Sequence, residues 1–157
     1  MYNFNKEKKR LEPSDAKCQY CEVENSTDME DNYFVPLFRE NDRTNIIVYR
    51  SVKYSKVPVG VPRCKTCLEI HREAASRSQL TAWGIAFGVV VFSIMIWGAG
   101  GILSIVLGLV IGFLGTHLLQ NKMVREKGIF TKMEGAKRNP AVQELVIDGW
   151  SFNQPTA

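Results

Sequence analysis

The sequence contains four cysteines, which fall into two pairs of identical spacing. Cys18 and Cys21 form the first C-x2-C pair, and Cys64 and Cys67 form the second. A C-x2-C turn directs two thiolates toward one point, so two such turns can supply the four sulfur ligands of a tetrahedral zinc ion. The alternative is a pair of disulfides or redox-active pairs. A reducing cytosol and the lack of a βαβ pattern beside either pair both disfavour that alternative.

The expected zinc site is structural rather than catalytic, because four thiolates leave no coordination position for water. His71 follows the second pair as Cys67-x3-His71, a spacing that could bring an imidazole near the metal on a helix. The other interpretation is a partly exposed histidine on a helix that runs from Leu68 through Arg77. Only His71 and His117 are available as histidine bases, and no nucleophile with its base can be assembled. We therefore expect a protein that is not an enzyme.

The segment between the two pairs must form the scaffold that brings them together. Three stretches rich in β-branched and aromatic residues, 33–38, 45–50 and 52–59, predict short strands. The polar stretch Arg39 to Thr44 suits a turn between the first two. We expect residues 1–17 to be a polar tail and residues 18–79 to form a zinc-ribbon-like module with a small antiparallel sheet.

A long apolar region follows this module. Residues 78–121 contain no Lys, Arg, Asp or Glu. A single helix over residues 80–119 would be about twice as long as the hydrocarbon core is thick. The glycine-rich stretch 98–101 allows a reversal. We therefore predict a two-helix transmembrane hairpin with spans 80–97 and 102–119, each ~27 Å long.

Small residues recur at helical spacing in both spans. The first contains Gly84-x3-Gly88 and the second contains Gly108-x3-Gly112. Such residues allow helix backbones to approach closely in a membrane. They can pack the two spans of one hairpin together, they can pack copies of the protein together, and the two arrangements can coexist.

Basic residues flank the spans, whereas the glycine turn has none. Because cations within about twenty residues of a span favour the cytoplasmic side, both termini are expected in the cytoplasm. We expect no secretory signal, because no apolar run comes before the first cysteine pair, and we expect insertion to depend on the spans themselves. The flanking cations are Arg63, Lys65, Arg72 and Arg77 on the N-terminal side, and Lys122, Arg125, Lys127, Lys132, Lys137 and Arg138 on the C-terminal side.

Residues 120–157 begin as a basic juxtamembrane segment and end in a short predicted helix. Asn139 can cap that helix, Pro140 suits its first turn, and Gly149 can end it. Trp150 and Phe152 follow as two large apolar anchors. A helix this short is unstable alone, so it must dock onto the zinc module or capture a partner.

The motif Val61-Pro62-Arg63-Cys64-x2-Cys67-x3-His71, the two glycine-rich spans and the ending Gly149-Trp150-Ser151-Phe152 together resemble a known arrangement. They are similar to poorly characterised small membrane proteins with a split cytosolic zinc ribbon followed by a transmembrane hairpin. This resemblance covers most of the chain. It implies an architecture and carries no known activity.

The sequence thus predicts an α+β membrane protein: a zinc-braced antiparallel sheet joined to a two-helix hairpin. Its expected function is that of a membrane-anchored zinc-binding scaffold that presents a cytosolic module to a protein partner. The alternative is a homo-oligomer whose hairpins form a pore or perturb the bilayer, gated by the zinc module, although the spans lack charged residues to select ions. The net charge is only +4, which argues against nucleic acid as a partner.

Overall fold

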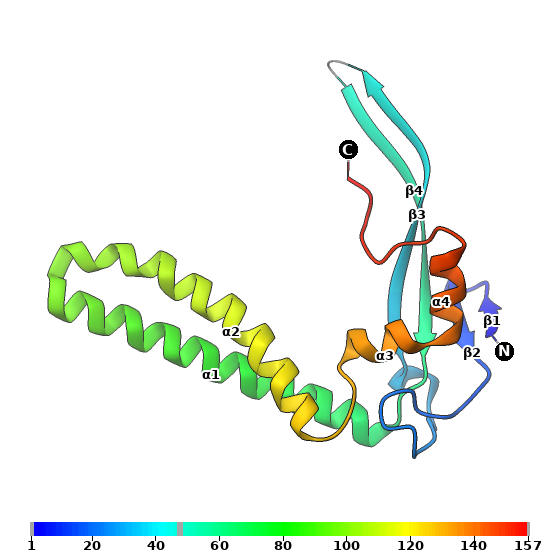
Figure 1. Ribbon diagram of the computed structural model, residues 1–157, viewed down its shortest axis with the longest axis horizontal. Helices are drawn as coiled ribbons and strands as arrows, with labels where there is room; N and C mark the ends of the chain where they lie inside the picture. Colours follow the sequence, from blue (N-terminus) through cyan, green and yellow to red (C-terminus); the bar gives the residue numbers. More distant parts are fainter. Residues whose placement is uncertain (1, 47–48, 157) are drawn as a thin grey trace. The chain divides into compact units, whose positions relative to one another are not determined.

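The computed structural model describes residues 2–46 and 49–156 (Figure 1). The chain forms two compact units: residues 1–65 with residues 132–157, and residues 66–131. The predicted strand 45–50 includes Ile47 and Val48, which lie outside the described residues. Met1 of the predicted tail and Ala157 of the predicted C-terminal segment also lie outside them.

The first unit is built on a four-stranded sheet with strand order β1-β2-β4-β3. Two antiparallel pairs, β1 with β2 and β3 with β4, are joined by a parallel contact between Leu11 of β2 and Val59 of β4. The sheet is therefore mixed, whereas an antiparallel sheet was predicted. The strands are β1 (Tyr2–Asn5), β2 (Arg10–Pro13), β3 (Tyr33–Ile46) and β4 (Tyr49–Val61), and the 3-10 turn η1 (Met29–Asp31) precedes β3.

The first part of the chain is not the polar tail that we expected, because it contains β1 and β2. Its two strands pair from Tyr2 with Pro13 through to Asn5 with Arg10. The guanidinium of Arg10 lies 4.0 Å from the centre of the Phe34 ring, which ties this hairpin to β3. The sequence signal is weak because the strands are short and the pairing of β2 with β4 is non-local.

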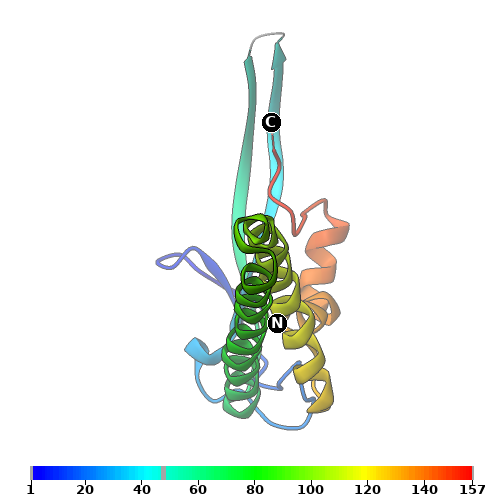
Figure 2. The same cartoon turned by 90° about the vertical axis from the view of Figure 1, so that its left-hand side faces the viewer.

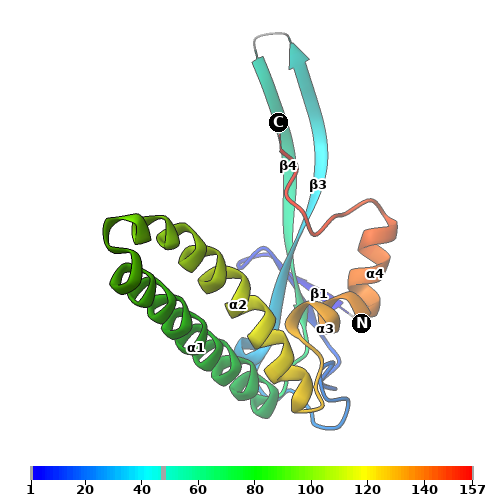
Figure 3. The same cartoon turned by 60° about the vertical axis from the view of Figure 1, so that its left-hand side comes forward.

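The stretch Arg39 to Thr44 is also not a turn. It continues β3, which pairs with β4 along its whole described length, with one irregularity between Glu40 and Asp42. The polar residues that suggested a turn lie on a two-stranded ribbon with both faces open to solvent, where charged side chains are favourable. Figure 3 shows this ribbon as the long β3–β4 hairpin.

Two short helices complete the first unit. They are α3 (Lys132–Arg138) and α4 (Pro140–Ile147). The predicted helix at Pro140 is confirmed, since the Asn139 side chain caps it. α3 was not predicted. Helices and strands share one core, whose most buried members include Tyr20, Val35, Leu37, Val59, Val61 and Val142.

The second unit is a helical hairpin, seen nearly end-on in Figure 2. α1 (Lys65–Trp97) runs without a break through the predicted first span, and α2 (Ser104–Glu126) contains most of the second. Between them lies η2 (Gly98–Leu103), a 3-10 segment that begins with Gly98 at a φ of +55°. By length and composition, both helices are able to cross a membrane.

The glycines of the two spans differ in what they contact. A Cβ at Gly108 would lie 2.7 Å from Val90 Cγ2, and one at Gly112 would lie 3.2 Å from the Trp83 ring, so both glycines lie against α1. By contrast, nothing lies within 4 Å of a Cβ at Gly84 or Gly88. α1 also carries buried small residues at four-residue spacing, and two of them, Ala82 and Ala86, lie near Gly115 and Gly108 of α2. The buried set is Ala74, Ser78, Ala82 and Ala86.

Candidate metal centre

The four cysteines converge, as their spacing predicted. Their Sγ atoms all lie within 4.8 Å of one another, and those of Cys21 and Cys64 are 3.8 Å apart. All four are free thiols rather than disulfides. An ion bound tetrahedrally by sulfur at ~2.3 Å requires ligand atoms ~3.8 Å apart. The cluster therefore fits a four-coordinate metal ion with little rearrangement.

The first pair sits in a tight loop held by main-chain hydrogen bonds. The Glu22 N–H donates to the Cys18 carbonyl at 3.0 Å, and Glu22 has a φ of +58°. The Cys18 N–H donates to the Glu24 carbonyl at 2.9 Å. Gln19 N–H then donates to the Pro62 carbonyl at 2.9 Å, so the first pair is attached to the residues just before the second.

The second pair is placed by the start of α1. The helix begins at Lys65, between Cys64 and Cys67, so both thiols lie at its N-terminal turn. The unsatisfied N–H groups and the dipole at a helix N-terminus favour negative charge. This position favours the thiolate form, which is the form that binds metal.

The pKa of the Cys21 thiol is lowered from its ordinary 9.0 to about 7. Burial acts in the opposite direction and raises this pKa. It is outweighed by hydrogen bonds from the backbone at Glu24 and Val23 and by the neighbouring thiols Cys18 and Cys64. Cys18, Cys64 and Cys67 are each only 1% exposed, whereas Cys21 is half-buried. Deprotonation of Cys21 near neutral pH favours the binding of a cation at this sulfur.

His71 does not belong to the convergent set of potential ligands. It lies on α1, as predicted, but it is 1% exposed rather than partly exposed. Its Nε2 lies 3.0 Å from the Phe130 carbonyl oxygen. Because a carbonyl can only accept, that nitrogen carries the hydrogen, and His71 joins α1 to the segment after α2.

Sequence reasoning missed the residues that position the second pair. Arg63, only 6% exposed, donates from Nε to the Asp31 carbonyl at 2.8 Å and from its main-chain N–H to Asn32 Oδ1 at 3.1 Å. These bonds fix the chain directly before Cys64. The available signal is an arginine directly before a cysteine pair.

Trp150 and Phe152, the predicted anchors, are both half-buried within the first unit. The residue between them, Ser151, pairs with Phe38 of β3 through two main-chain hydrogen bonds of 2.7 and 2.8 Å. Gln154 Nε2 donates to the Tyr54 hydroxyl at 2.9 Å. The tail thus docks on the sheet of its own chain, one of the two alternatives that the sequence left open. Capture of a partner by the same residues stays a prediction.

Compared with models of known protein families, with curated proteins and with solved structures, the chain matches none of them. The resemblance to membrane proteins with a split zinc ribbon therefore stays a prediction.

Proposed function

We propose that the chain is a membrane-anchored zinc protein that presents a cytosolic module to a protein partner. The hairpin of α1 and α2 lies in the bilayer, and a structural zinc ion bound by Cys18, Cys21, Cys64 and Cys67 braces the module. The single observation that carries this proposal is the contrast between two long helices whose apolar residues remain uncovered and a closed cluster of four thiols.

The exposure of the hairpin supports its place in a bilayer. The most apolar 18-residue stretch of each helix is largely uncovered. Only 17% of this stretch in α1 and 11% of it in the helix that contains α2 is buried by the rest of the chain. A core helix of a water-soluble protein would be mostly covered. Lipid tails can cover these apolar side chains and so keep them out of water. The large side chains left open include Phe87, Phe92, Met95, Leu103, Val106, Phe113 and Leu118.

The chemistry of the cluster supports zinc as the ion. Four thiolates in tetrahedral arrangement suit zinc or an iron–sulfur centre, and two C-x2-C pairs around one point are typical of structural zinc. Because all four positions would be taken by sulfur, the ion contributes to folding rather than to catalysis.

A partner surface is supported by the outer face of α4. Ile147 is 84% exposed and Val146 is 40% exposed. With Val142 and Phe152 they line a groove of about 360 Å³. An apolar groove on the exposed surface of the module supports contact with another protein. Its occupant is an apolar side chain of that partner.

The test is site-specific photo-cross-linking in intact cells, where the protein remains in its natural membrane. A benzophenone amino acid replaces Ile147 in one variant and Val23 in the other. Val23 provides a matched control because it is an apolar residue of the same unit and is 83% exposed. The proposal expects one recurrent protein adduct from position 147 and none from position 23. Equal adducts from both positions, or lipid adducts alone, would contradict it.

The homo-oligomeric alternative is favoured by the bare face of α1 at Gly84 and Gly88. In that case a second copy of the hairpin lies on these glycines, and pairs of copies cross-link through a cysteine placed at Gly88. A pore additionally requires ion conductance from liposomes that contain the purified chain. Cross-linking without conductance supports assembly and removes the pore.

A further inference from the structure

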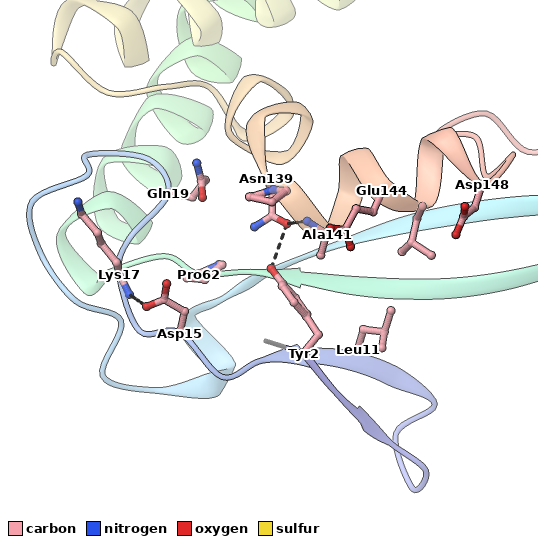
Figure 4. Close-up of a pocket in the computed structure, with 12 residues that line it drawn as sticks. Tyr2, Leu11, Asp15, Lys17, Gln19, Pro62, Asn139, Ala141, Glu144 and Asp148 are labelled. Atoms are coloured by element: carbon pink, nitrogen blue, oxygen red, sulfur yellow. Dashed lines mark hydrogen bonds between the residues drawn. The ribbon is translucent and has the colours of Figure 1, made fainter.

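A pocket of about 470 Å³ lies within the first unit, on a different side of α4 from the groove at Ile147 (Figure 4). One wall is α4 with the residue that caps it, and the other is formed by β1, β2 and the loop before Cys18. The pocket is large enough for part of a peptide. It is lined by Tyr2, Leu11, Asp15, Lys17, Gln19, Pro62, Asn139, Pro140, Ala141, Glu144, Leu145 and Asp148.

Asn139 is the most informative residue of this pocket. It is only 3% exposed. Its Oδ1 accepts three hydrogen bonds, from the Tyr2 hydroxyl at 3.0 Å and from the N–H groups of Ala141 and Val142 at 3.1 and 3.3 Å. Three donors at one amide atom identify that atom as the oxygen. The orientation of the side chain is therefore fixed.

The amide nitrogen of Asn139 is left as a donor. Among residues 2–46 and 49–156, no acceptor bonds to Nδ2. In Figure 4 this nitrogen lies on the side of the pocket where Gln19 and Pro62 are drawn. Although the residue is 3% exposed overall, Nδ2 is not among the fully buried atoms that lack a partner, so this nitrogen opens to the pocket. It can therefore donate to a hydrogen-bond acceptor on whatever occupies the pocket.

The hydroxyl of Tyr2 keeps this arrangement over a wide pH range. Its pKa is raised because it is buried, an effect that the hydrogen bond to Asn139 reduces and that the nearby Asp15 carboxylate reinforces. The phenol stays protonated and continues to donate at neutral pH.

The charges of the pocket indicate the rest of the occupant. Asp15, Glu144 and Asp148 face one cation, Lys17. Asp15 accepts a hydrogen bond from the Lys17 main-chain N–H at 3.2 Å. None of the three carboxylates forms an ion pair within the described part of the chain. They do not converge as metal ligands there either, while Leu11, Pro62 and Leu145 supply apolar surface between them.

We propose that this pocket binds an extended segment of a partner protein that carries an arginine or a lysine. A main-chain carbonyl of the segment accepts from Asn139 Nδ2. The aliphatic part of the basic side chain lies on the apolar surface, and its charged end pairs with the carboxylates of Asp15, Glu144 and Asp148. This rests on the proposed role in protein interaction and adds a second, chemically different contact for the partner.

The test uses the full chain in lipid nanodiscs and a fluorescein-labelled peptide with one central arginine between alanines. Fluorescence anisotropy measures binding. The same peptide with citrulline in place of arginine keeps the shape and removes the charge, and we expect it to bind about tenfold more weakly. Glu144→Gln with Asp148→Asn should weaken the arginine peptide similarly. Glu7→Gln with Asp42→Asn, which removes two negative charges at exposed carboxylates outside the pocket, should leave it unchanged.

Asn139→Asp separates this proposal from simple charge attraction. Aspartate keeps an oxygen to cap α4 and to accept from Tyr2, but it replaces the donor by a second acceptor. A site that only attracts cations would bind the arginine peptide more tightly, because the variant gains a negative charge. The proposal predicts binding weakened about fivefold, with thermal stability retained.

Two results would overturn the proposal directly: no saturable binding of the arginine peptide, or tighter binding by the Asn139→Asp variant. A third concerns agmatine, a cation that has no peptide carbonyl. If agmatine displaced the labelled peptide as effectively as the unlabelled peptide does, the proposal would also be overturned. None of these would alter protein adducts at Ile147, so failure here is distinguishable from failure of the proposed function.

Discussion

Gly135 of α3 lies directly against the ring of Tyr20, the residue that precedes Cys21. A Cβ at position 135 would overlap Tyr20 Cε1 and lie 2.7 Å from Cδ1. Tyr20 is fully buried, and its hydroxyl donates to the Lys132 carbonyl at 3.4 Å. A helix near the end of the chain therefore covers the loop that holds the first pair of thiols.

Gly135→Ala should destabilise the first unit, because the added methyl group has no space and Tyr20 has no solvent-exposed position to move into. Overpacking of this kind costs ~1–3 kcal/mol. Thermal unfolding of the full chain should occur at lower temperature, and a chelator should remove the metal faster. Gly88→Ala provides the control, since nothing lies within 4 Å of its Cβ. Equal melting temperatures for the two variants would show that α3 does not support the cysteine loop.

Much of the cluster could be predicted because its determinants are local. Cys18 and Cys21 are brought together by their own turn, and the two consecutive residues Asn139 and Pro140 specify the start of α4. The close packing of Gly135 on Tyr20 joins residues far apart in sequence, and no local pattern indicates it. The same holds for the parallel contact between Leu11 and Val59, which converts the expected polar tail into part of the sheet.

The metal content should be about one zinc ion per chain, lost when any one of Cys18, Cys21, Cys64 or Cys67 is changed to serine. His71→Ala should keep the metal, because His71 contacts the Phe130 carbonyl and lies outside the cluster of four thiols. Elemental analysis of the purified full chain measures both. Retention of metal by a Cys→Ser variant together with its loss in His71→Ala would show that the ligand set is different.

The metal-free chain should become more stable as pH rises from about 7 toward 9.0. The folded state holds the pKa of Cys21 at about 7, against an ordinary value of 9.0. A group with a depressed pKa contributes its full stabilisation above its unfolded pKa and loses it as pH falls through the folded pKa. Thermal unfolding across this range measures the effect. Cys21→Ser should reduce the slope, and an unchanged slope would contradict this assignment.

The turn of the hairpin should tolerate no side chain at Gly101. A Cβ there would lie 2.7 Å from Ile94 Cα and 2.7 Å from the Ser93 carbonyl oxygen, both main-chain atoms that cannot rotate away. Gly101→Ala should therefore open the turn and lower the yield of folded chain in detergent. Gly84→Ala, on the uncovered face of α1, should have little effect. A Gly84→Ala variant more damaging than Gly101→Ala would instead indicate that copies of the protein pack through that face.

The division of roles among the glycines could not be predicted from spacing. Gly84-x3-Gly88 and Gly108-x3-Gly112 are equivalent as patterns, yet only the second pair lies against the other helix. The positions of Ala82 and Ala86 relative to the turn determine which face of α1 packs against α2. A shift of one residue in the 3-10 segment η2 would rotate a different face inward, and such a shift leaves no mark in a local motif.

The most direct test of the membrane-anchored arrangement is cysteine labelling in intact cells with an impermeant maleimide. Ile102→Cys places a thiol at the hairpin turn, and Ser14→Cys places one in the loop before the first cysteine pair. The chain with only its native cysteines provides the background. The account predicts labelling of position 102 from outside, and labelling of position 14 only after the membrane is permeabilised. Labelling of position 14 in intact cells, or release of the chain from membranes by alkaline carbonate, would contradict it.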